Sequence, residues 1–315
     1  MKSDLEVAKD RNTRQKKLHE LSDSDDEATR AAVALNPNTA KRTLNHLLED
    51  HSTWVASLAE KQLGIEFSFP DIHPTAIISP TAKIGSEVKI GPFSVIHGNT
   101  IIGDRTVIGA YCEIGVSSPK ELGPLIIKKE SLIRSHSVFY TGSSFGERLT
   151  TGHRVTVREC TRAGKNLQIG TLSDIQGHCT IGDFVRLHSN VHIGQSATIG
   201  NFVWIFPYVV LTNDPHPPSD TKLGVTIKDF VAIATMSVIL PGITVNEGVL
   251  IGAHSLINKD VPSNMVAMGS PAKHVCETSK IQLKDGRGPA YPWRQHFRRG
   301  YPDDVVREWI AEFGK

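Results

Sequence analysis

The sequence has few cysteines, almost no net charge and no long apolar run, and each shortage excludes a class of protein. The four cysteines among 315 residues are Cys112, Cys160, Cys179 and Cys276. They lie far apart and form no C-x-x-C pair, so neither a disulfide framework nor a zinc site is expected. No segment approaches roughly 18 consecutive apolar residues, and the N-terminus has no apolar stretch typical of a secretory signal. We therefore expect reduced cysteines, a cytoplasmic location and no membrane association.

The charge of the chain is also too small to identify a partner. Lysine and arginine number 35 against 33 acidic residues, which leaves a formal net charge of only +2. Such a balance gives no field that attracts nucleic acid, so no nucleic-acid partner is expected, and any bound anion must be held by local groups. The chain is 39% hydrophobic, which is enough for a substantial core.

A repeat of six residues dominates the chain from residue 72 onward. In its first register, eight successive positions are isoleucine: Ile72, Ile78, Ile84, Ile90, Ile96, Ile102, Ile108 and Ile114. The phase slips by one residue around 117–124 and then continues from Ile127 to Leu211. After a second break, the repeat returns from Ile227 to Ile257. Two interruptions therefore separate three registers.

The repeat has the periodicity of short strands. The residue two positions before each hexad residue is also small or aliphatic, as at Val88, Cys112 and Cys179. Two inward positions separated by two residues are typical of a strand, whereas a helix repeats apolar positions every three to four residues. Three hexads form an 18-residue triangular coil, and stacked coils pair at about 4.8 Å. The sequence predicts an all-β core of about ten coils, with Cys112 and Cys179 packed inside.

The two ends lack the hexad. Residues 1–69 are predicted to form a small helical segment, partly disordered over about the first 20 residues. A stretch around Asn36-Pro37 resembles variant leucine-rich helical repeats, and the alternative is a helical cap or oligomerisation segment. Residues 276–315 form a C-terminal extension, in which Pro302 and Asp303 open a helix that should dock on the coils or on a neighbouring subunit. Its apolar stripe consists of Val305, Val306, Trp309, Ile310 and Phe313.

The longer break in the hexad is the first place to look for a site. After Leu211 the chain reads TNDPHPPSDTKLG, which is too polar and proline-rich to continue a coil. A coil stack has little concavity of its own, so a pocket is expected at an interruption or between stacks. The candidate residues in this loop are Asn213, Asp214 and His216.

The stretch from Asp229 to Lys273, which ends in GSPAK, resembles the terminal coils of hexapeptide-repeat acyltransferases. This resemblance covers residues 70–275 and implies a left-handed parallel β-helix, a homotrimer, and acetyl-CoA as acyl donor with no metal. The stretch HSNVHIGQSATIGNFVWIFPYVVLTNDPHPPS is similar to sugar-nucleotide N-acetyltransferases. That similarity implies an amino group of a nucleotide-linked sugar as acceptor, in surface-polysaccharide synthesis. Those enzymes are shorter, and the coils from Ile72 to Ala163 have no counterpart in them.

The same resemblance implies roles for particular residues. Asn190 is expected to orient the acceptor or the thioester, and the Asn213–Asp214 loop is expected to approach the sugar of a neighbouring subunit. The pantetheine arm of the coenzyme is expected to lie along small outward residues of the last coils, with lysines near its phosphates. The coenzyme-binding candidates are Ala234, Ser237, Ala253, Lys259 and Lys273.

Because the sequence contains histidines that could act as a general base, the acceptor group could be either an alcohol or an amine. An alcohol acceptor requires a general base, for which His216 in the loop or an outward histidine such as His188 is suited. An amine acceptor needs less help, because a neutral amine is already a nucleophile. O-acyl transfer to a sugar or small alcohol is therefore the first alternative.

Two further alternatives come from different classes of function. One is a metal lyase like the γ-class carbonic anhydrases, suggested by His153, His188 and His192. Ligands two coils apart should be 36 residues apart, whereas these are separated by 35 and 4. The other alternative is a scaffold without catalytic activity.

Overall fold

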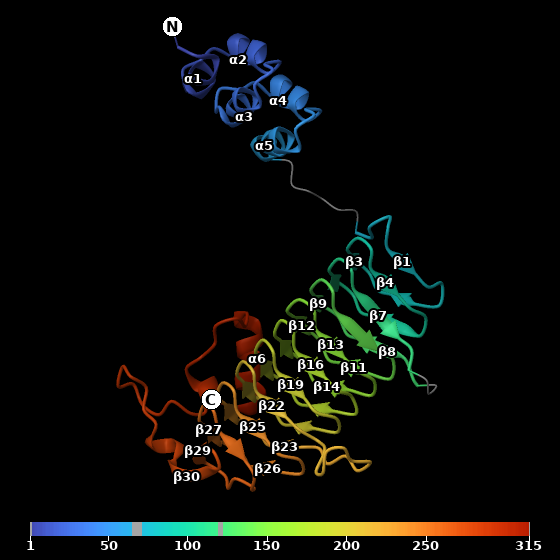
Figure 1. The fold of residues 1–315 in the computed structure, drawn as a ribbon, viewed down its shortest axis with the longest axis vertical. Coiled ribbons are helices and arrows are strands. Elements are labelled where there is room, and N and C mark those ends of the chain that lie inside the picture. Colours follow the sequence, from blue (N-terminus) through green and yellow to red (C-terminus); the bar gives the residue numbers. More distant parts are fainter. Residues whose placement is uncertain (1, 65–70, 119–121, 315) are drawn as a thin grey trace. The chain divides into compact units, whose positions relative to one another are not determined.

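The protein divides into two compact units, Met1–Phe69 and Pro70–Lys315. The structure is a computed structural model, and it describes residues 2–64, 71–118 and 122–314 (Figure 1). Each unit has its own hydrophobic core, so each is described by itself. Within the described ranges, no helix is long and apolar enough to cross a membrane.

The N-terminal unit is a cluster of short helices. Its described residues form α1 (Asp4–Lys9), α2 (Gln15–Leu21), α3 (Glu27–Leu35), α4 (Lys41–Leu47) and α5 (Thr53–Leu63). Ser3 begins α1 with a capping box, and Gly64 ends α5 in the left-handed conformation at φ 66°. The first 20 residues, where we expected partial disorder, contain α1 and most of α2. Asn36-Pro37 does separate two helices, and the Asn36 side chain donates to the Ala8 carbonyl at 2.8 Å.

A buried ion pair crosses this helical unit. Arg30 on α3 donates from Nε to Asp50 Oδ2 at 2.7 Å, and the two side chains are only 4% and 5% exposed. The second guanidinium nitrogen, Nη1, donates to the Ser24 carbonyl at 2.7 Å. The pair therefore fixes α3 against the segment that joins α4 to α5.

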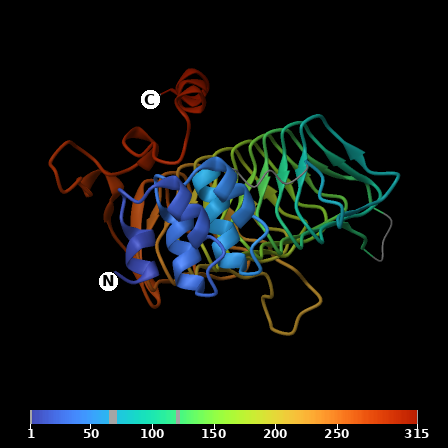
Figure 2. The same ribbon diagram turned by 90° about the horizontal axis from the view of Figure 1, so that it is seen from above.

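The C-terminal unit is a left-handed parallel β-helix of about ten coils, as the hexad and the family resemblance predicted. Its described strands form three sheets that we number in chain order (Figures 1 and 2). Sheet 1 contains β1 (Ile77–Ile78), β4 (Val95–Ile96), β7 (Glu113–Val116), β10 (Val138–Tyr140), β13 (Thr156–Val157), β16 (Asp174–Ile175), β19 (His192–Ile193), β22 (Val210–Leu211), β25 (Val238–Ile239) and β28 (Leu256–Ile257).

Sheets 2 and 3 complete each triangular coil. Sheet 2 contains β2 (Lys83–Ile84), β5 (Thr100–Ile102), β8 (Leu125–Ile127), β11 (Ser144–Phe145), β14 (Arg162–Ala163), β17 (Thr180–Ile181), β20 (Thr198–Ile199), β23 (Thr226–Ile227) and β26 (Thr244–Val245). Sheet 3 contains β3 (Lys89–Ile90), β6 (Val107–Ile108), β9 (Leu132–Ile133), β12 (Thr150–Thr151), β15 (Gln168–Ile169), β18 (Arg186–Leu187), β21 (Trp204–Ile205), β24 (Ala232–Ile233), β27 (Leu250–Ile251), β29 (Met265–Gly269) and β30 (Ala272–Glu277).

The core of the β-helix consists of the inward hexad positions. Ile114, Phe139 and Val157 stack in register in sheet 1 and are fully buried. Cys112 and Cys179 are each 1% exposed, which confirms that they are core residues. Ile72 is 42% exposed because it lies at the open N-terminal end of the stack, where only one neighbouring coil can cover it.

The C-terminal extension folds back onto the coils. After the antiparallel pair β29–β30 come the short 3₁₀ helices η1 (Thr278–Lys280) and η2 (Trp293–Gln295), and then α6 (Asp303–Phe313). The predicted stripe is correct, and Val305, Val306 and Trp309 are buried against the β-helix. Trp309 lies edge-on to Phe184 and Phe202, with ring centroids 5.5 Å away in both cases. The helix predicted from residue 303 therefore docks on the coil stack of its own chain.

Candidate functional site

The loop between β22 and β23 leaves the coil stack at the corner where sheet 1 passes to sheet 2 (Figure 2). Its base is anchored, because the Leu223 N–H donates to the Asn213 carbonyl at 2.8 Å. Lys222 forms an ion pair with Asp214 and also donates to the Ser219 carbonyl at 3.1 Å. Asn213 and Asp214 are thus half-buried at the base, whereas His216 is exposed farther along the loop.

Asn190 lies at a different corner, where sheet 3 passes to sheet 1. It adopts a left-handed conformation with φ 59°, which asparagine tolerates better than most residues. Its N–H donates to the Thr171 carbonyl of the preceding coil at 2.9 Å, so the backbone there is fixed. After β19 the chain reaches Gly194, where a side chain would collide with the Leu211 carbonyl and approach Asn213. Asn190 precedes β19 and Asn213 follows β22, so the two residues lie at opposite edges of sheet 1, and the structure does not bring them together.

A histidine–aspartate pair occupies the sheet face between these corners. His192 Nδ1 lies 3.1 Å from Asp174 Oδ2, and the two residues are in register on β19 and β16. Burial by itself would raise the pKa of Asp174, but hydrogen bonds from His192 and Gln176 outweigh it and keep that pKa below its ordinary value. Asp174 therefore stays ionised at neutral pH and can orient the imidazole.

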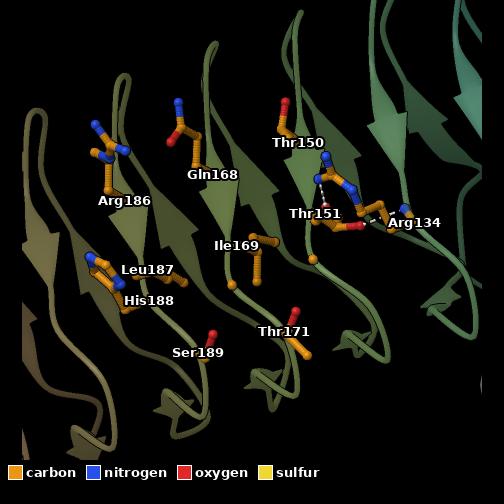
Figure 3. Close-up of a pocket in the computed structure, with 12 residues that line it drawn as sticks. Arg134, Thr150, Thr151, Gln168, Ile169, Thr171, Arg186, Leu187, His188 and Ser189 are labelled. Atoms are coloured by element: carbon orange, nitrogen blue, oxygen red, sulfur yellow. Dashed lines mark hydrogen bonds between the residues drawn. The ribbon is translucent and has the colours of Figure 1, made fainter. Parts of the chain in front are cut away.

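His188 faces a separate cavity on sheet 3. The cavity has a volume of about 280 Å³ and lies over β12, β15 and β18 (Figure 3). Its lining includes Arg134, Thr150, Gln168, Arg186 and His188. Figure 3 shows Arg186 and His188 on one side of this cavity and Arg134 on the other. His188 is therefore on a different face from the loop that carries Asp214 and His216.

The His188 ring is held by aromatic neighbours. It stacks on Phe206 with the ring centroids 5.0 Å apart, and it lies parallel to Trp204 at 5.9 Å. Burial, and then the nearby Arg186 guanidinium, lower the pKa of His188 below its ordinary value of 6.5. The imidazole is thus neutral at pH 7 and available as a hydrogen-bond donor or acceptor.

Two of the three small residues expected along the pantetheine arm lie at the surface of the last coils, and the third does not. Ala234 follows β24 and Ala253 follows β27, and both lie on the turns from sheet 3 to sheet 1. The expectation that Ser237 faces outward is wrong: it is fully buried, and its hydroxyl donates to the Gly252 carbonyl at 2.9 Å. Ser237 stands two positions before Ile239, so the hexad itself directs it inward.

The two lysines do lie together. Lys259 and Lys273 line one cavity of about 270 Å³ at the C-terminal end of the stack, which also includes Asp260 and His274. Both lysine side chains are exposed there, so their ammonium groups are accessible to an anion from solvent. The structure thus brings two cationic side chains to one cavity.

The three histidines considered as metal ligands each contact a different partner. His153 Nδ1 lies 2.8 Å from the Ser135 hydroxyl, while His188 stacks on Phe206 and His192 pairs with Asp174. Among the described residues, no group of three histidine, cysteine or acidic side chains is placed to hold a metal ion.

Our reading of the sequence missed the partners that lie one coil away. Asp174 was not considered, although it precedes His192 by the 18 residues of a full coil and therefore had to be its neighbour. Arg134 and Arg186 were also missed, since their cavity depends on glycines at 152 and 170 between them. A search for polar residues 18 positions apart would have found the Asp174–His192 pair.

Comparisons with known proteins agree with this architecture. Residues 81–115 match the family described as Bacterial transferase hexapeptide (six repeats). The UDP-N-acetylglucosamine acyltransferase of Arabidopsis has the same fold, with a TM-score of 0.50 and 18% identity over 77% of this chain and 81% of that chain. The chain is therefore a left-handed β-helix protein, and it is similar to the hexapeptide-repeat family over residues 81–115.

Two curated relatives are similar in sequence over part of their length. Galactoside O-acetyltransferase of Escherichia coli is 33% identical over 28% of this chain and 55% of its own. The 2,3,4,5-tetrahydropyridine-2,6-dicarboxylate N-acetyltransferase of Staphylococcus aureus is 33% identical over 30% of this chain and 33% of its own. The chain thus spans about half or less of the length of the curated relatives it matches.

Proposed function

We propose that this protein transfers an acetyl or other short acyl group from acyl-CoA to an amino group of a nucleotide-linked sugar, in the synthesis of a surface polysaccharide. The observation that carries the proposal is the polar break after Leu211, where Asn213 and Asp214 are held at the base of a projecting loop. The relatives named above support acyl transfer, since one is an O-acetyltransferase and the other an N-acetyltransferase.

The acceptor site is proposed to lie between two chains of a homotrimer. Asn190 and the Asn213–Asp214 loop lie at different corners of one coil stack, so a small acceptor meets both only if neighbouring chains each contribute one corner. The corner of Asn190 also carries a row of exposed apolar side chains suited to contact with a second copy. They are Phe93, Tyr111, Leu172, Tyr208 and Met236, which are 53%, 52%, 50%, 55% and 49% exposed.

The reaction needs few catalytic side chains if the acceptor is an amine. A neutral amine attacks the thioester carbonyl, its C–N bond forms as the C–S bond breaks, and the coenzyme leaves as a thiol after taking up the proton that the amine loses. The Asn190 carboxamide is proposed to orient the reacting groups, and Asp214 to hold the sugar. Ala234 and Ala253 leave room for the pantetheine arm, and Lys259 and Lys273 are proposed to bind the phosphates.

The test is release of coenzyme A thiol from acetyl-CoA when a 3-amino sugar nucleotide is added. We expect steady release with the full chain and about 100-fold less with Asn190→Gly, because a lost orienting or oxyanion contact costs this much. Glycine removes the carboxamide and still tolerates φ 59°. Arg154→Gly is the matched control, at the same corner two coils earlier with φ 55°. No acyl transfer to any amino sugar, with acetyl-CoA left intact, would refute the proposal.

Co-expression tests whether two chains share the site. Asn190→Gly and Asp214→Ala are each expected to be inactive alone. If chains mix at random, about one interface in four receives Asn190 and Asp214 from unmutated corners, so about a quarter of the activity returns. A site within one chain would give no recovery, and that result would contradict the shared site.

The His192–Asp174 pair favours O-acyl transfer as the second candidate function. An imidazole oriented by an ionised carboxylate is suited to remove the proton of a sugar hydroxyl, which contributes about 10²–10⁴-fold to such reactions. We expect His192→Gln to abolish transfer to a hydroxyl acceptor and to leave transfer to an amine within about threefold. Comparing the two acceptors with this one variant identifies the chemistry, and equal losses with both would show that His192 only supports the fold.

A further inference from the structure

The cavity on sheet 3 contains two arginines that no carboxylate neutralises. Among the residues that the structure describes, no acidic group lies within ion-pair distance of Arg134 or Arg186. Other arginines of the same stack are paired: Arg105 with Glu130 at 2.6 Å, and Arg158 with Glu159 at 3.1 Å. Arg134 is exposed and Arg186 is half-buried, so these two unpaired guanidinium groups are accessible to an anion from outside the chain.

The Arg186 side chain is held in place by two aromatic rings and a backbone carbonyl. Its guanidinium carbon lies 4.8 Å from the Trp204 ring centroid, and also 5.3 Å from that of Tyr301. One of its nitrogens donates to the Arg299 carbonyl at 3.0 Å, which leaves other N–H groups available. Burial lowers the pKa of Arg186, which is the effect of a cation removed from water without an anion beside it.

Arg134 closes the other end of the cavity. Its Nη1 donates to the Thr151 carbonyl at 2.9 Å, so the side chain lies along the floor (Figure 3). The floor between the two arginines is open because positions 152 and 170 are glycine. A Cβ at Gly170 would lie 2.3 Å from the His188 carbonyl carbon, since the coils touch there. The close contact between coils thus keeps the space above the floor free of side chains.

The dimensions indicate an elongated anion. Arg134 and the pair formed by Arg186 and His188 are three coil spacings apart, or roughly 14 Å between their Cα atoms. The long arginine side chains reduce this gap, and a diphosphate reaches farther across it than one orthophosphate. A volume of about 280 Å³ is close to the lower limit for organic ligand pockets, so the cavity fits two linked phosphates better than a whole nucleotide.

We propose that this cavity binds a diphosphate group, with Arg134 at one end and Arg186 and His188 at the other. Arginine recognises phosphate oxygens through paired N–H groups, and the neutral His188 ring can donate one further hydrogen bond. The diphosphate could be free or belong to a nucleotide sugar or to coenzyme A, and the chemistry of recognition is the same for all three. The inference does not depend on acyl transfer, because binding is measured without turnover.

The test is calorimetric titration of the full-length protein with pyrophosphate, UDP and coenzyme A, each at low and at moderate salt. We expect pyrophosphate to bind once per chain, with the dissociation constant raised at least tenfold by Arg134→Gln. Arg186→Lys should weaken binding several-fold, because it keeps the charge but loses the paired donors. Arg162→Gln is the matched control, since it removes the same charge from an exposed position on sheet 2.

The three titrants identify the source of the diphosphate. If Arg134→Gln weakens the binding of UDP, the cavity binds the diphosphate of a nucleotide. If it weakens the binding of coenzyme A, the cavity binds the diphosphate of the coenzyme. If it weakens the binding of pyrophosphate alone, the cavity binds a free diphosphate. Each of these three results supports the proposed site. The proposal is overturned if pyrophosphate does not bind, or if Arg134→Gln and Arg162→Gln change its dissociation constant equally. Activity assays on amino sugars can fail or succeed without affecting this result.

Discussion

Trp309→Ala should release the C-terminal helix from the β-helix, at a cost of about 3–5 kcal/mol in the free energy of docking. The side chain is 1% exposed and is among the largest fully buried groups in the described chain. Its ring lies 5.1 Å from Tyr301 and 5.5 Å from Phe184, measured between centroids. Alanine would leave a cavity among aromatic rings that are fixed by the coils and cannot collapse into it.

The effect should be local, because stacked coils depend mainly on their nearest neighbours. We expect amide hydrogen exchange in α6 to rise by two orders of magnitude or more, while the strands of sheet 1 keep their protection. Arg307→Ala on the exposed side of the same helix is the control and should change little. Equal protection of α6 in Trp309→Ala and the wild type would show that the helix is held by its ion pairs, such as Lys165 with Glu312, and not by the aromatic cluster.

The same variant connects the helix to the cavity on sheet 3. Tyr301 contacts both Trp309 and the Arg186 guanidinium, so release of α6 removes one wall from Arg186. Gln168 also donates to the Gly300 carbonyl at 3.4 Å, which joins the cavity lining to the segment before α6. The aromatic extension is therefore part of what positions the unpaired arginine.

The coil stack was predictable because its inward positions repeat at a fixed interval. Phe139 and Phe145 stand on the hexad that runs from Ile127 to Leu211, and they are 0% and 1% exposed. The same rule places Ser237 inside, and we assigned it to the coenzyme only because it lies in a matching motif. Where periodicity and motif disagree about the direction of a side chain, the periodicity is the better guide, since it follows from the pleat of the strand.

The contacts of the extension were not predictable in this way. Trp293 donates from Nε1 to the Phe202 carbonyl at 2.9 Å across 91 residues, and no repeat in the sequence relates the two positions. The cavity beside Arg186 depends on such contacts, so it was not predictable from the sequence. His192 and Asp174, by contrast, are one coil apart and required only the 18-residue interval. Sites within the regular stack can thus be inferred from spacing, whereas those that need the extension require the structure.

In the helical unit, Arg30→Ala is expected to lower stability by about 3 kcal/mol, since it leaves the buried Asp50 carboxylate without its cation. The Arg30 side chain is 4% exposed and that of Asp50 5%, so water does not replace the lost partner readily. The Ser24 carbonyl, which accepts from Arg30 at 2.7 Å, also loses its donor. Arg42→Ala on the exposed face of α4 removes the same charge and should have little effect.

The pH dependence identifies the cause of this loss. Burial alone would raise the pKa of Asp50, but hydrogen bonds from Arg30 and the Ser52 N–H outweigh it and hold the pKa below 3.8. Because the folded pKa is below the unfolded one, the stabilisation is present above pH 3.8 and is lost as pH falls through the folded value. In Arg30→Ala the burial remains without its compensation, so the pKa of Asp50 rises above its ordinary value, and the variant loses stability as pH rises through that value and recovers it as pH falls.

Hydrogen exchange of α3 and α5 in the full chain, measured from pH 4 to 7, distinguishes this account from a simple loss of packing. Arg30→Met keeps most of the buried volume but removes the charge, so it should reproduce the pH-dependent loss. Adding Asp50→Asn should recover part of the stability near neutral pH, because a neutral amide is less costly to bury than an unpaired carboxylate. If Arg30→Met is as stable as the wild type at pH 7, the ion pair does not hold the helices together, and the unit is stabilised by its apolar core alone.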